Sequence, residues 1–449
     1  RPRGPRGPCG RSPQARRVGA ERLGAALPPA RPRPMFRPMD RIDTDILIVG
    51  GGAAGLAAAG LFAAEGFDVT CVDAAPPVTD AGQPGADLRT TALMTPSVEA
   101  LTRAGAWAHL APHAAPLATM RLVDAGGPEP VPAPRETADF VAAEMQPEPF
   151  GWNLPNTVLR AGLLARLDEL PRARLRAPAT LAALTLRETE AIARLDGPAP
   201  AQVRARLVVA ADGRDSAARG LAGLTAHRWS YAQKALVFAV AHPDPHDGVS
   251  TEIHRTGGPF TLVPLPDATD GTHRSSVVWM ETGPKAATLA AMARDDAPGF
   301  EAALNARACG ALGGLRLASP TALWPIVAQL APRLDGPRTA LIAEAAHVVP
   351  PIGAQGLNMS LADAAALARI AGEAFRTGGD PGAPEILARY HRARWPEMAA
   401  RVAGIDALNR AAMAESQVLR DLRRMGLRAF HQATPVRRAA MRMGMGART

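Results

Sequence analysis

Three glycines and one acidic residue near the start of the chain have the types and the spacing that bind a dinucleotide. Gly50, Gly52 and Gly55 form the pattern G-x-G-x-x-G, and Asp73 follows eighteen residues after the last glycine. The first glycine permits a tight turn, the second lets the backbone approach a pyrophosphate, and the third lets a helix pack close to a strand. The carboxylate of Asp73 can accept hydrogen bonds from an adenosine ribose, so we expect dinucleotide binding.

The segments around these residues predict the elements that position them. Residues 46–49 form an apolar, β-branched run that is typical of a buried parallel strand. Residues 53–64 are almost entirely alanine, leucine and glycine, which favours a helix packed close to a sheet. Ala53 and Ala54 open that helix, where free N–H groups can face phosphates. Residues 68–72 predict a second strand. A Gly/Ala-rich packing turn is the alternative, but it leaves the acidic residue after the second strand unexplained.

Two later stretches also place an acidic residue after a predicted strand. Residues 206–211 are followed by Asp212 and Gly213, and residues 339–343 by Glu344. In an open α/β sheet, the carboxyl ends of the strands are where ligands bind.

A stiff loop and a helix start follow the second of these acidic residues. The loop contains a Pro-Pro pair that ends in Pro351, and proline restricts the backbone there. Gly353 and Gly356 flank the start of a helix that we expect over residues 355–371. The N-terminus of such a helix can face an anionic ring or a phosphate.

Composition limits the classes of protein that this chain can represent. Its 449 residues suffice for about two to three domains. The net charge of +9 comes from the ends, because residues 1–40 contain ten arginines and two acids, and residues 418–449 contain eight arginines and one acid. The mildly acidic remainder argues against nucleic-acid binding. Cys9, Cys71 and Cys309 are widely spaced, which predicts neither a disulfide framework nor a metal site and fits a reducing compartment.

Both ends of the chain have distinct compositions. Residues 1–40 contain nine prolines and no helical or strand periodicity, so we expect a disordered basic segment. The alternatives are an organelle-targeting peptide, against which the prolines argue, and upstream sequence, because Met35 and Met39 lie just before the first strand. Residues 401–449 predict a helical basic segment, which either contacts an anionic membrane surface or packs on the nucleotide-binding domain.

Between these landmarks, the pattern alternates between helices and strands. We expect a helix over residues 88–104 and another after the segment FGWNLPN, which begins at Phe150. Alternating apolar residues at 235–240, 261–265 and 275–279 predict antiparallel strands of a second domain.

Together the motifs resemble the class A flavoprotein aromatic hydroxylases over roughly residues 44–400, because the three acid- and glycine-containing stretches occur in the same order there. The segments PPIGAQGLN and FGWNLPN are most similar to the ubiquinone-biosynthesis hydroxylase branch. The resemblance implies an α/β fold in which a Rossmann-like FAD-binding domain, of the para-hydroxybenzoate hydroxylase type, is interleaved with a β-sheet substrate domain and followed by C-terminal helices. The implied FAD-binding domain comprises residues 41–116, 150–225 and 331–400, and the implied substrate domain residues 117–149 and 226–330.

The resemblance also implies which residues contact FAD. Asp73 would bind the adenosine ribose, Arg89 would lie near the phosphates, and Glu344 would bind the ribityl side. The full implied set is Gly50, Gly52, Ala53, Ala54, Gly55, Asp73, Arg89, Asn156, Asp212, Gly213, Glu344, Pro351, Gly353, Gln355, Gly356, Leu357 and Asn358. The chain departs from the family pattern at Ala343 and Ala354, which stand where glycines are usual, and at Glu344, which stands where aspartate is usual and keeps the carboxylate.

The implied reaction is aromatic hydroxylation. NAD(P)H or another electron donor, such as a ferredoxin-type protein, reduces FAD, and reaction with O₂ gives a C4a-hydroperoxyflavin that attacks an electron-rich ring. The substrate would be a polyprenyl phenol or benzoquinone precursor in ubiquinone biosynthesis. We assign no catalytic residue. We expect His347 to be a structural histidine that bonds the backbone, with a role as general base as the alternative, and nothing ranks Tyr231, His227 and His254.

Two other functions stay open, namely an FAD-dependent oxidoreductase of the same fold that does not hydroxylate and a non-catalytic flavin-binding member of a biosynthetic complex. The expected partners are a small aromatic or polyprenylated substrate and, as alternatives, a biosynthetic complex and a peripheral membrane contact. No metal or nucleic acid is expected. The expected location is the cytoplasm, with attachment to the inner membrane surface as the alternative.

Overall fold

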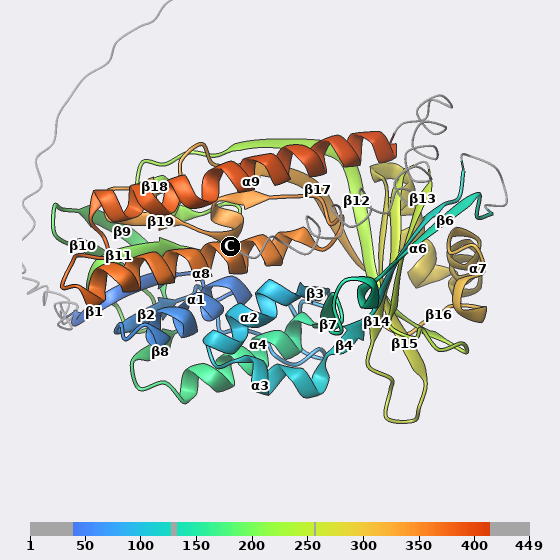
Figure 1. Cartoon of the computed structure of the whole chain (residues 1–449), viewed down its shortest axis with the longest axis horizontal. Coiled ribbons are helices and arrows are strands. Elements are labelled where there is room, and N and C mark those ends of the chain that lie inside the picture. The colour runs from blue at the N-terminus through green and yellow to red at the C-terminus, as the bar shows by residue number, and fades with distance from the viewer. Residues whose placement is uncertain (1–38, 127–132, 256, 414–449) are drawn as a thin grey trace, which may run out of the picture. The chain divides into compact units, whose positions relative to one another are not determined.

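Three β-sheets and their connecting helices make up the part of the chain that the computed structural model describes, residues 39–126, 133–255 and 257–413 (Figure 1). Residues 1–38 and 414–449 lie outside the described residues. The expected disorder of the first segment and the expected basic helix in the last one therefore stay predictions. The division into an FAD-binding and a substrate domain at the residues given above also stays a prediction.

The first sheet is built on the two strands that the glycine motif predicted. β1 (Asp40–Val49) pairs in parallel with β2 (Val69–Val72) on one side and with β11 (Ala201–Ala210) on the other. The run at 46–49 is the buried end of β1. The remaining strands of this sheet are β8 (Ala173–Arg176), β9 (Thr180–Leu186), β10 (Ala191–Asp196), β18 (Asp335–Gly336) and β19 (Thr339–Leu341).

Helices with small side chains pack closely beside this sheet. α1 (Ala53–Ala64) has the predicted bounds, and its residues from Ala54 to Phe62 are buried. It packs against α4 (Asn156–Asp168) and α8 (Gln355–Arg376), and α8 in turn packs against α9 (Pro384–Met413). A helix buried on all sides must be apolar all round, which explains its composition. The short helix α5 (Ala217–Leu221) follows β11.

A nine-stranded, mostly antiparallel sheet forms the second layer, and its two faces have different neighbours. On β12, Leu236 and Phe238 face the helices α6 and α7, whereas Ala235 and Val237 face the opposite side, as the period of two in a strand requires. The elements of this layer are β5 (Thr119–Asp124), β6 (Glu136–Val141), β12 (His227–His242), β13 (Val249–Arg255), β14 (Gly258–Leu265), β15 (His273–Thr282), β16 (Arg316–Leu317), β17 (Ala322–Leu330), β20 (His347–Val348), α6 (Gly283–Asp295) and α7 (Ala297–Arg307).

One predicted helix is wrong in its first half. Residues Thr90–Met94 form strand β3, which pairs with β7 (Gly151–Pro155), and the helix α2 begins only at Thr95 and ends at Arg103. Pro96 lies in the first turn of α2, where its missing N–H is no loss, so it marks the true helix start. The third sheet is completed by β4 (Ala115–Leu117), and α3 (Trp107–Leu110) follows α2.

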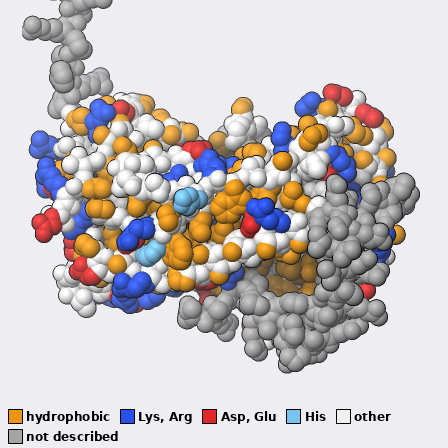
Figure 2. All heavy atoms as spheres, turned by 90° about the horizontal axis from the view of Figure 1, so that it is seen from above, with side chains coloured by type: hydrophobic (Ala, Val, Ile, Leu, Met, Phe, Trp, Pro, Cys, Tyr) orange, Lys and Arg blue, Asp and Glu red, His pale blue; other side chains and the backbone are white. Residues whose placement is uncertain are grey.

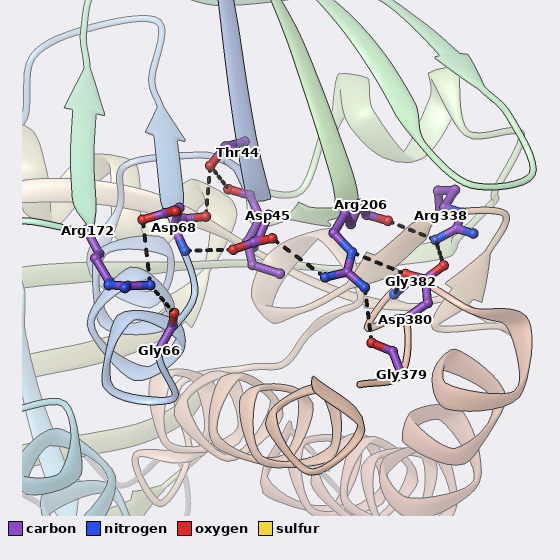
Figure 3. Close-up of polar contacts among 11 residues, drawn as sticks. Thr44, Asp45, Gly66, Asp68, Arg172, Arg206, Arg338, Gly379, Asp380 and Gly382 are labelled. Carbon is purple, nitrogen blue, oxygen red and sulfur yellow. Dashed lines mark hydrogen bonds and ion pairs between the residues drawn. The ribbon is translucent and has the colours of Figure 1, made fainter. Parts of the chain in front are cut away.

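Polar side chains tie together the amino ends of the parallel strands (Figure 3). The carboxylate of Asp45 accepts a hydrogen bond from the backbone N–H of Asp68 at 3.0 Å and lies 3.7 Å from the guanidinium of Arg206. Arg206 also donates to the carbonyl of Gly379 at 3.0 Å, in the loop between α8 and α9. These contacts close one end of the sheet, so the ends of the strands that remain for a ligand are the carboxyl ends.

The outer surface over α9 carries charges of both signs. Figure 2 shows hydrophobic side chains gathered along the middle of this face, with Lys and Arg interspersed among Asp and Glu. Leu408 of α9 is an exposed apolar residue. Within the described ranges, none of the helices is both long enough and apolar enough to cross a bilayer.

A buried carboxylate joins α8 to α9 and to β20. Asp363 is fully buried, and its two oxygens lie 2.7 Å from Nε2 of His347 and 3.0 Å from Nε of Arg394. The expectation that His347 bonds the backbone is therefore wrong, because its partner is the side chain of Asp363. The phenol of Tyr390 donates to the carbonyl of Leu341 at 2.9 Å and adds a second link between α9 and the sheet.

We expect Asp363→Ala to lower the free energy of unfolding by about 3–5 kcal/mol, because it leaves the charge of Arg394 buried without its main partner. Urea unfolding followed by circular dichroism measures the change. The control is Glu373→Ala, which removes a partly exposed ion-pair partner on the same helix and should cost less than about 1 kcal/mol. Equal effects of the two substitutions would contradict the importance of the buried network.

Candidate functional site

One cavity of about 740 Å³ connects the carboxyl ends of the first sheet to the inner face of the nine-stranded sheet. Gly52, Asp212 and Gly353, which are far apart in the sequence, all line it. Fifteen of the seventeen predicted cofactor-binding residues line this cavity, namely Gly50, Gly52, Ala53, Ala54, Asp73, Arg89, Asn156, Asp212, Gly213, Glu344, Pro351, Gly353, Gln355, Gly356 and Leu357.

The structure gives a different reason for the absence of a side chain at each of the three motif glycines. Gly50 has φ +114°, and a side chain there would collide with the carbonyl of Ala211. A Cβ on Gly55 would collide with the carbonyl of Gly50, so Gly55 lets α1 close on the turn although it does not line the cavity. Gly52 has ordinary extended backbone, and a Cβ there would meet nothing within 4 Å. The backbone of Gly52 therefore lies directly beside the open space of the cavity.

Two helix N-termini face the cavity without side-chain caps. α1 begins after Gly52 and α8 after Ala354, and neither helix has a side-chain cap or an acidic residue in its first turn. Their first N–H groups are therefore left for a ligand, and each helix end carries partial positive charge. The cavity is suited to a ligand with negative charge at two separate places.

Asp73 is held at the end of β2 by the backbone. Its carboxylate accepts hydrogen bonds from the N–H groups of Gly51 at 2.6 Å and of Ala75 at 3.0 Å. These bonds keep the carboxylate beside the glycine turn, where it lines the cavity.

Asp87, which the sequence analysis missed, organises the polar groups around Arg89. Its carboxylate accepts two hydrogen bonds from the Arg89 guanidinium, both at 2.8 Å, and one from the amide of Asn156 at 2.9 Å. Burial disfavours the charge of Asp87, but the hydrogen bonds and charge of Arg89 outweigh it and hold the pKa of this carboxyl below its usual value. The Arg89 guanidinium lies 4.5 Å from the ring centroid of Trp324. The only signal in the sequence was an acid two residues before Arg89.

The acidic residues after β11 and β19 differ in the contacts that hold their carboxylates. The carboxylate of Asp212 accepts hydrogen bonds from the Ser216 hydroxyl and from the N–H of Ala218, so it is turned toward the start of α5. Glu344 is partly exposed and lies 3.6 Å from Arg214, another cavity residue that the sequence analysis missed.

Residues 43–404 match the protein family described as FAD binding domain. The chain belongs to this family. It is 35% identical over 426 residues to the ubiquinone hydroxylase UbiL of Rhodospirillum rubrum, covering 94% of each chain. It is 29% identical over 407 residues to the 3-demethoxyubiquinol 3-hydroxylase of Escherichia coli, covering 90% of this chain and 98% of that one. The crystal structure of p-nitrophenol 4-monooxygenase from Pseudomonas putida has the same fold, with a TM-score of 0.71 at 19% identity over 92% of this chain and 100% of that one.

These similarities confirm the predicted fold class, the dependence on FAD and the resemblance to the ubiquinone-biosynthesis hydroxylase branch. The chain is an FAD-dependent monooxygenase. Its cavity fits this cofactor, because Gly52 leaves room for a pyrophosphate and the uncapped end of α8 lies further along the same cavity. Among the described residues, no group of His, Cys, Asp and Glu could hold a metal ion.

The two alanines that stand where the resemblance implies glycines adopt the backbone that glycine favours. Ala343 has φ +55° and Ala354 has φ +54°, both in the left-handed region. An alanine in this conformation costs roughly 1–2 kcal/mol. The loop geometry is thus kept at some expense in stability.

Asn358 is the second predicted residue that does not line the cavity. Its side-chain oxygen accepts hydrogen bonds from the N–H of Met94 at 2.9 Å and from the hydroxyl of Ser97 at 2.6 Å. Its amide nitrogen donates to the carbonyls of Ala92 and Ala354. Asn358 therefore joins β3 and α2 to the first turn of α8 from behind the cavity.

Gly52→Val is expected to weaken FAD binding at least tenfold and to change the stability of the apoprotein by less than about 1 kcal/mol, because the new side chain enters open cavity without backbone strain. Titration of apoprotein with FAD, followed by flavin fluorescence, measures the affinity. Gly55→Ala is the matched control and should instead destabilise the fold. Unchanged FAD affinity in Gly52→Val would show that the cofactor does not approach this turn.

Ala354→Gly is expected to raise the free energy of unfolding by up to about 1 kcal/mol, because relief of the left-handed alanine exceeds the entropy that glycine adds to the unfolded chain. Ala362→Gly, in the interior of α8, should lower it by about 1 kcal/mol. Urea unfolding of both apoproteins makes the comparison. If both substitutions destabilise equally, the backbone of Ala354 is not strained.

Proposed function

We propose that this protein hydroxylates the aromatic ring of a polyprenylated phenol or quinone precursor in ubiquinone biosynthesis. It would use FAD, O₂, and NAD(P)H or another electron donor. The names of the two relatives above support this substrate class.

The observation that carries the proposal is the continuity of the cavity. From the two helix ends it extends to an apolar surface on the inner face of the nine-stranded sheet, where a ring with an apolar tail can be buried. The apolar lining residues of this sheet include Met120, Val237, Val263 and Val278, and Leu117 and Phe150 line the same cavity from outside the sheet. When bound, FAD supplies the activation of O₂, and the protein positions the substrate and excludes water.

Individual residues of the chain would act on the cofactor as the resemblance implies. Gly50 and Gly52 would accommodate the pyrophosphate, Asp73 would accept hydrogen bonds from the ribose, and Arg89 would lie near the phosphates. The N–H groups at the start of α8 would stabilise negative charge on the flavin ring. The apolar segment at 348–352 would shield the reacting atoms from solvent.

Membrane contact and assembly into a complex are further parts of the proposal. A polyprenylated substrate resides in lipid, so a peripheral position on the inner membrane surface would give access to it from the cytoplasm. The basic residues at 418–449 are the candidates for this contact.

Turnover under isotopically labelled O₂ tests the proposed reaction. We expect the purified protein to be yellow and to insert one labelled oxygen atom into the ring of a prenylated phenol, as measured by mass spectrometry. A product without label would overturn the proposed hydroxylation. So would a deletion strain whose growth is restored by a folded, FAD-free Glu344→Ala variant.

A further inference from the structure

A carboxylate lies within the part of the cavity that faces the nine-stranded sheet. Glu252 of β13 lines the cavity and is 9% exposed. Ser250, two residues earlier on the same face, and Thr261, opposite Glu252 on β14, line it as well. Ile253 lies on the other face and packs in the core under α6 and α7. Glu252 is therefore a charged group among otherwise neutral walls.

His254 holds this carboxylate in place. Its Nε2 lies 2.8 Å from Oε1 of Glu252, and both side chains are 11% exposed. This distance allows Nε2 to donate a hydrogen bond to the carboxylate, which can only accept. The Nδ1 atom of His254 has no hydrogen-bond partner among the described residues. One carboxylate oxygen of Glu252 thus contacts His254, and a carboxylate has further lone pairs that can accept a hydrogen bond from a ligand.

The cations of the cavity lining are engaged with other carboxylates. Among the described residues, the lining contains three arginines, Arg89, Arg160 and Arg214, and no lysine. Arg89 and Arg160 lie 2.8 and 3.5 Å from the carboxylate of Asp87, and Arg214 pairs with Glu344. The half of the cavity that contains Glu252 therefore favours a ligand that donates a hydrogen bond and disfavours a negatively charged one.

Strand register places Glu252 about the length of one substituted aromatic ring from the part of the cavity at the N-terminus of α8. Val263 follows Thr261 on the same face of β14 and packs, with Ala354, against the cluster of Ala92, Met94 and Leu117. Two residues along a strand span roughly 7 Å, and neighbouring strands lie roughly 5 Å apart. A substituted ring can bridge this separation.

We propose that Glu252, positioned by His254, is the specificity-determining residue that accepts a hydrogen bond from the ring hydroxyl of a neutral phenolic substrate. The inference rests on the proposed function and deepens it. It assigns the group that selects a free hydroxyl, and it predicts that a ring with a carboxylate substituent is rejected.

The test compares the binding of 2-prenylphenol, its O-methyl ether and 3-prenyl-4-hydroxybenzoate to the FAD-loaded protein. Titrations followed by flavin absorbance give the dissociation constants. We expect wild-type protein to bind the phenol roughly ten- to hundredfold more tightly than the ether, as a hydrogen bond to a charged acceptor allows, and to bind the benzoate weakly.

Variants then test which residue causes the preference for the phenol over the ether. Glu252→Gln should abolish the preference for the phenol without loss of FAD, whereas Glu136→Gln, on β6 of the same sheet and outside the cavity lining, should retain it. His254→Phe should reduce the phenol-to-ether ratio, and His254→Gln, whose amide can still donate, should restore it in part. A Glu252→Gln protein with the wild-type ratio, or a wild-type protein that binds phenol and ether equally, overturns the inference.

Labelled O₂ supplied to the same samples separates this inference from the proposed function. Labelled product together with an unchanged ratio in Glu252→Gln means that the inference is wrong and the proposed function stands. A ratio that depends on Glu252, without label in the product of wild-type protein, means that hydroxylation is wrong although the selection of the hydroxyl stands.

Discussion

The buried carboxylate of Asp363 couples α8 and α9 to the loop that carries several of the predicted cofactor-binding residues. An ionised side chain without solvent costs several kcal/mol unless it is paired and hydrogen-bonded. Here Arg394 of α9 and His347 of β20 both bond to it. Burial disfavours the charge of Arg394, yet the attraction of Asp363 prevails, so the pKa of this guanidinium lies above its usual value. The pairing requires α8, α9 and β20 to keep one relative position.

This position determines where the N-terminus of α8 meets the cavity. Asn358 bonds the first turn of the helix to β3 and α2, and Asp363 secures the next turn. The helix end can therefore face the cavity uncapped, with its N–H groups directed at a ligand instead of at a capping side chain. The left-handed Ala354 completes the turn, although a glycine would adopt that backbone at lower cost.

The fold that these proteins share does not by itself determine the substrate of each one. Solved monooxygenases at about one-fifth identity have the same fold, so the architecture alone does not select a substrate. Under the proposed function, side chains that line the cavity on the inner face of the nine-stranded sheet would select the substrate. Among the described residues, this part of the lining is apolar apart from a few polar groups, and Glu252 is its carboxylate.

The sequence by itself determined the local features of the cofactor site. The turn at Gly50, the helix at 53–64 and the buried strands around 46–49 and 206–211 depend on neighbours within a few residues, and the structure confirms them. Their order was also enough to identify the family, because the glycines and helix starts that bind phosphates act through local backbone geometry.

Only the tertiary structure decided the contacts between distant segments. Thr90–Met94 is a strand because β7, about sixty residues later, supplies its hydrogen bonds, and this pairing overrides the helical pattern. The partner of His347, the role of Asp87 and the place of Glu252 in the cavity likewise depend on which chain segments meet. Burial and ion pairing arise from these long-range contacts, and the spacing of residues along the chain does not encode them directly.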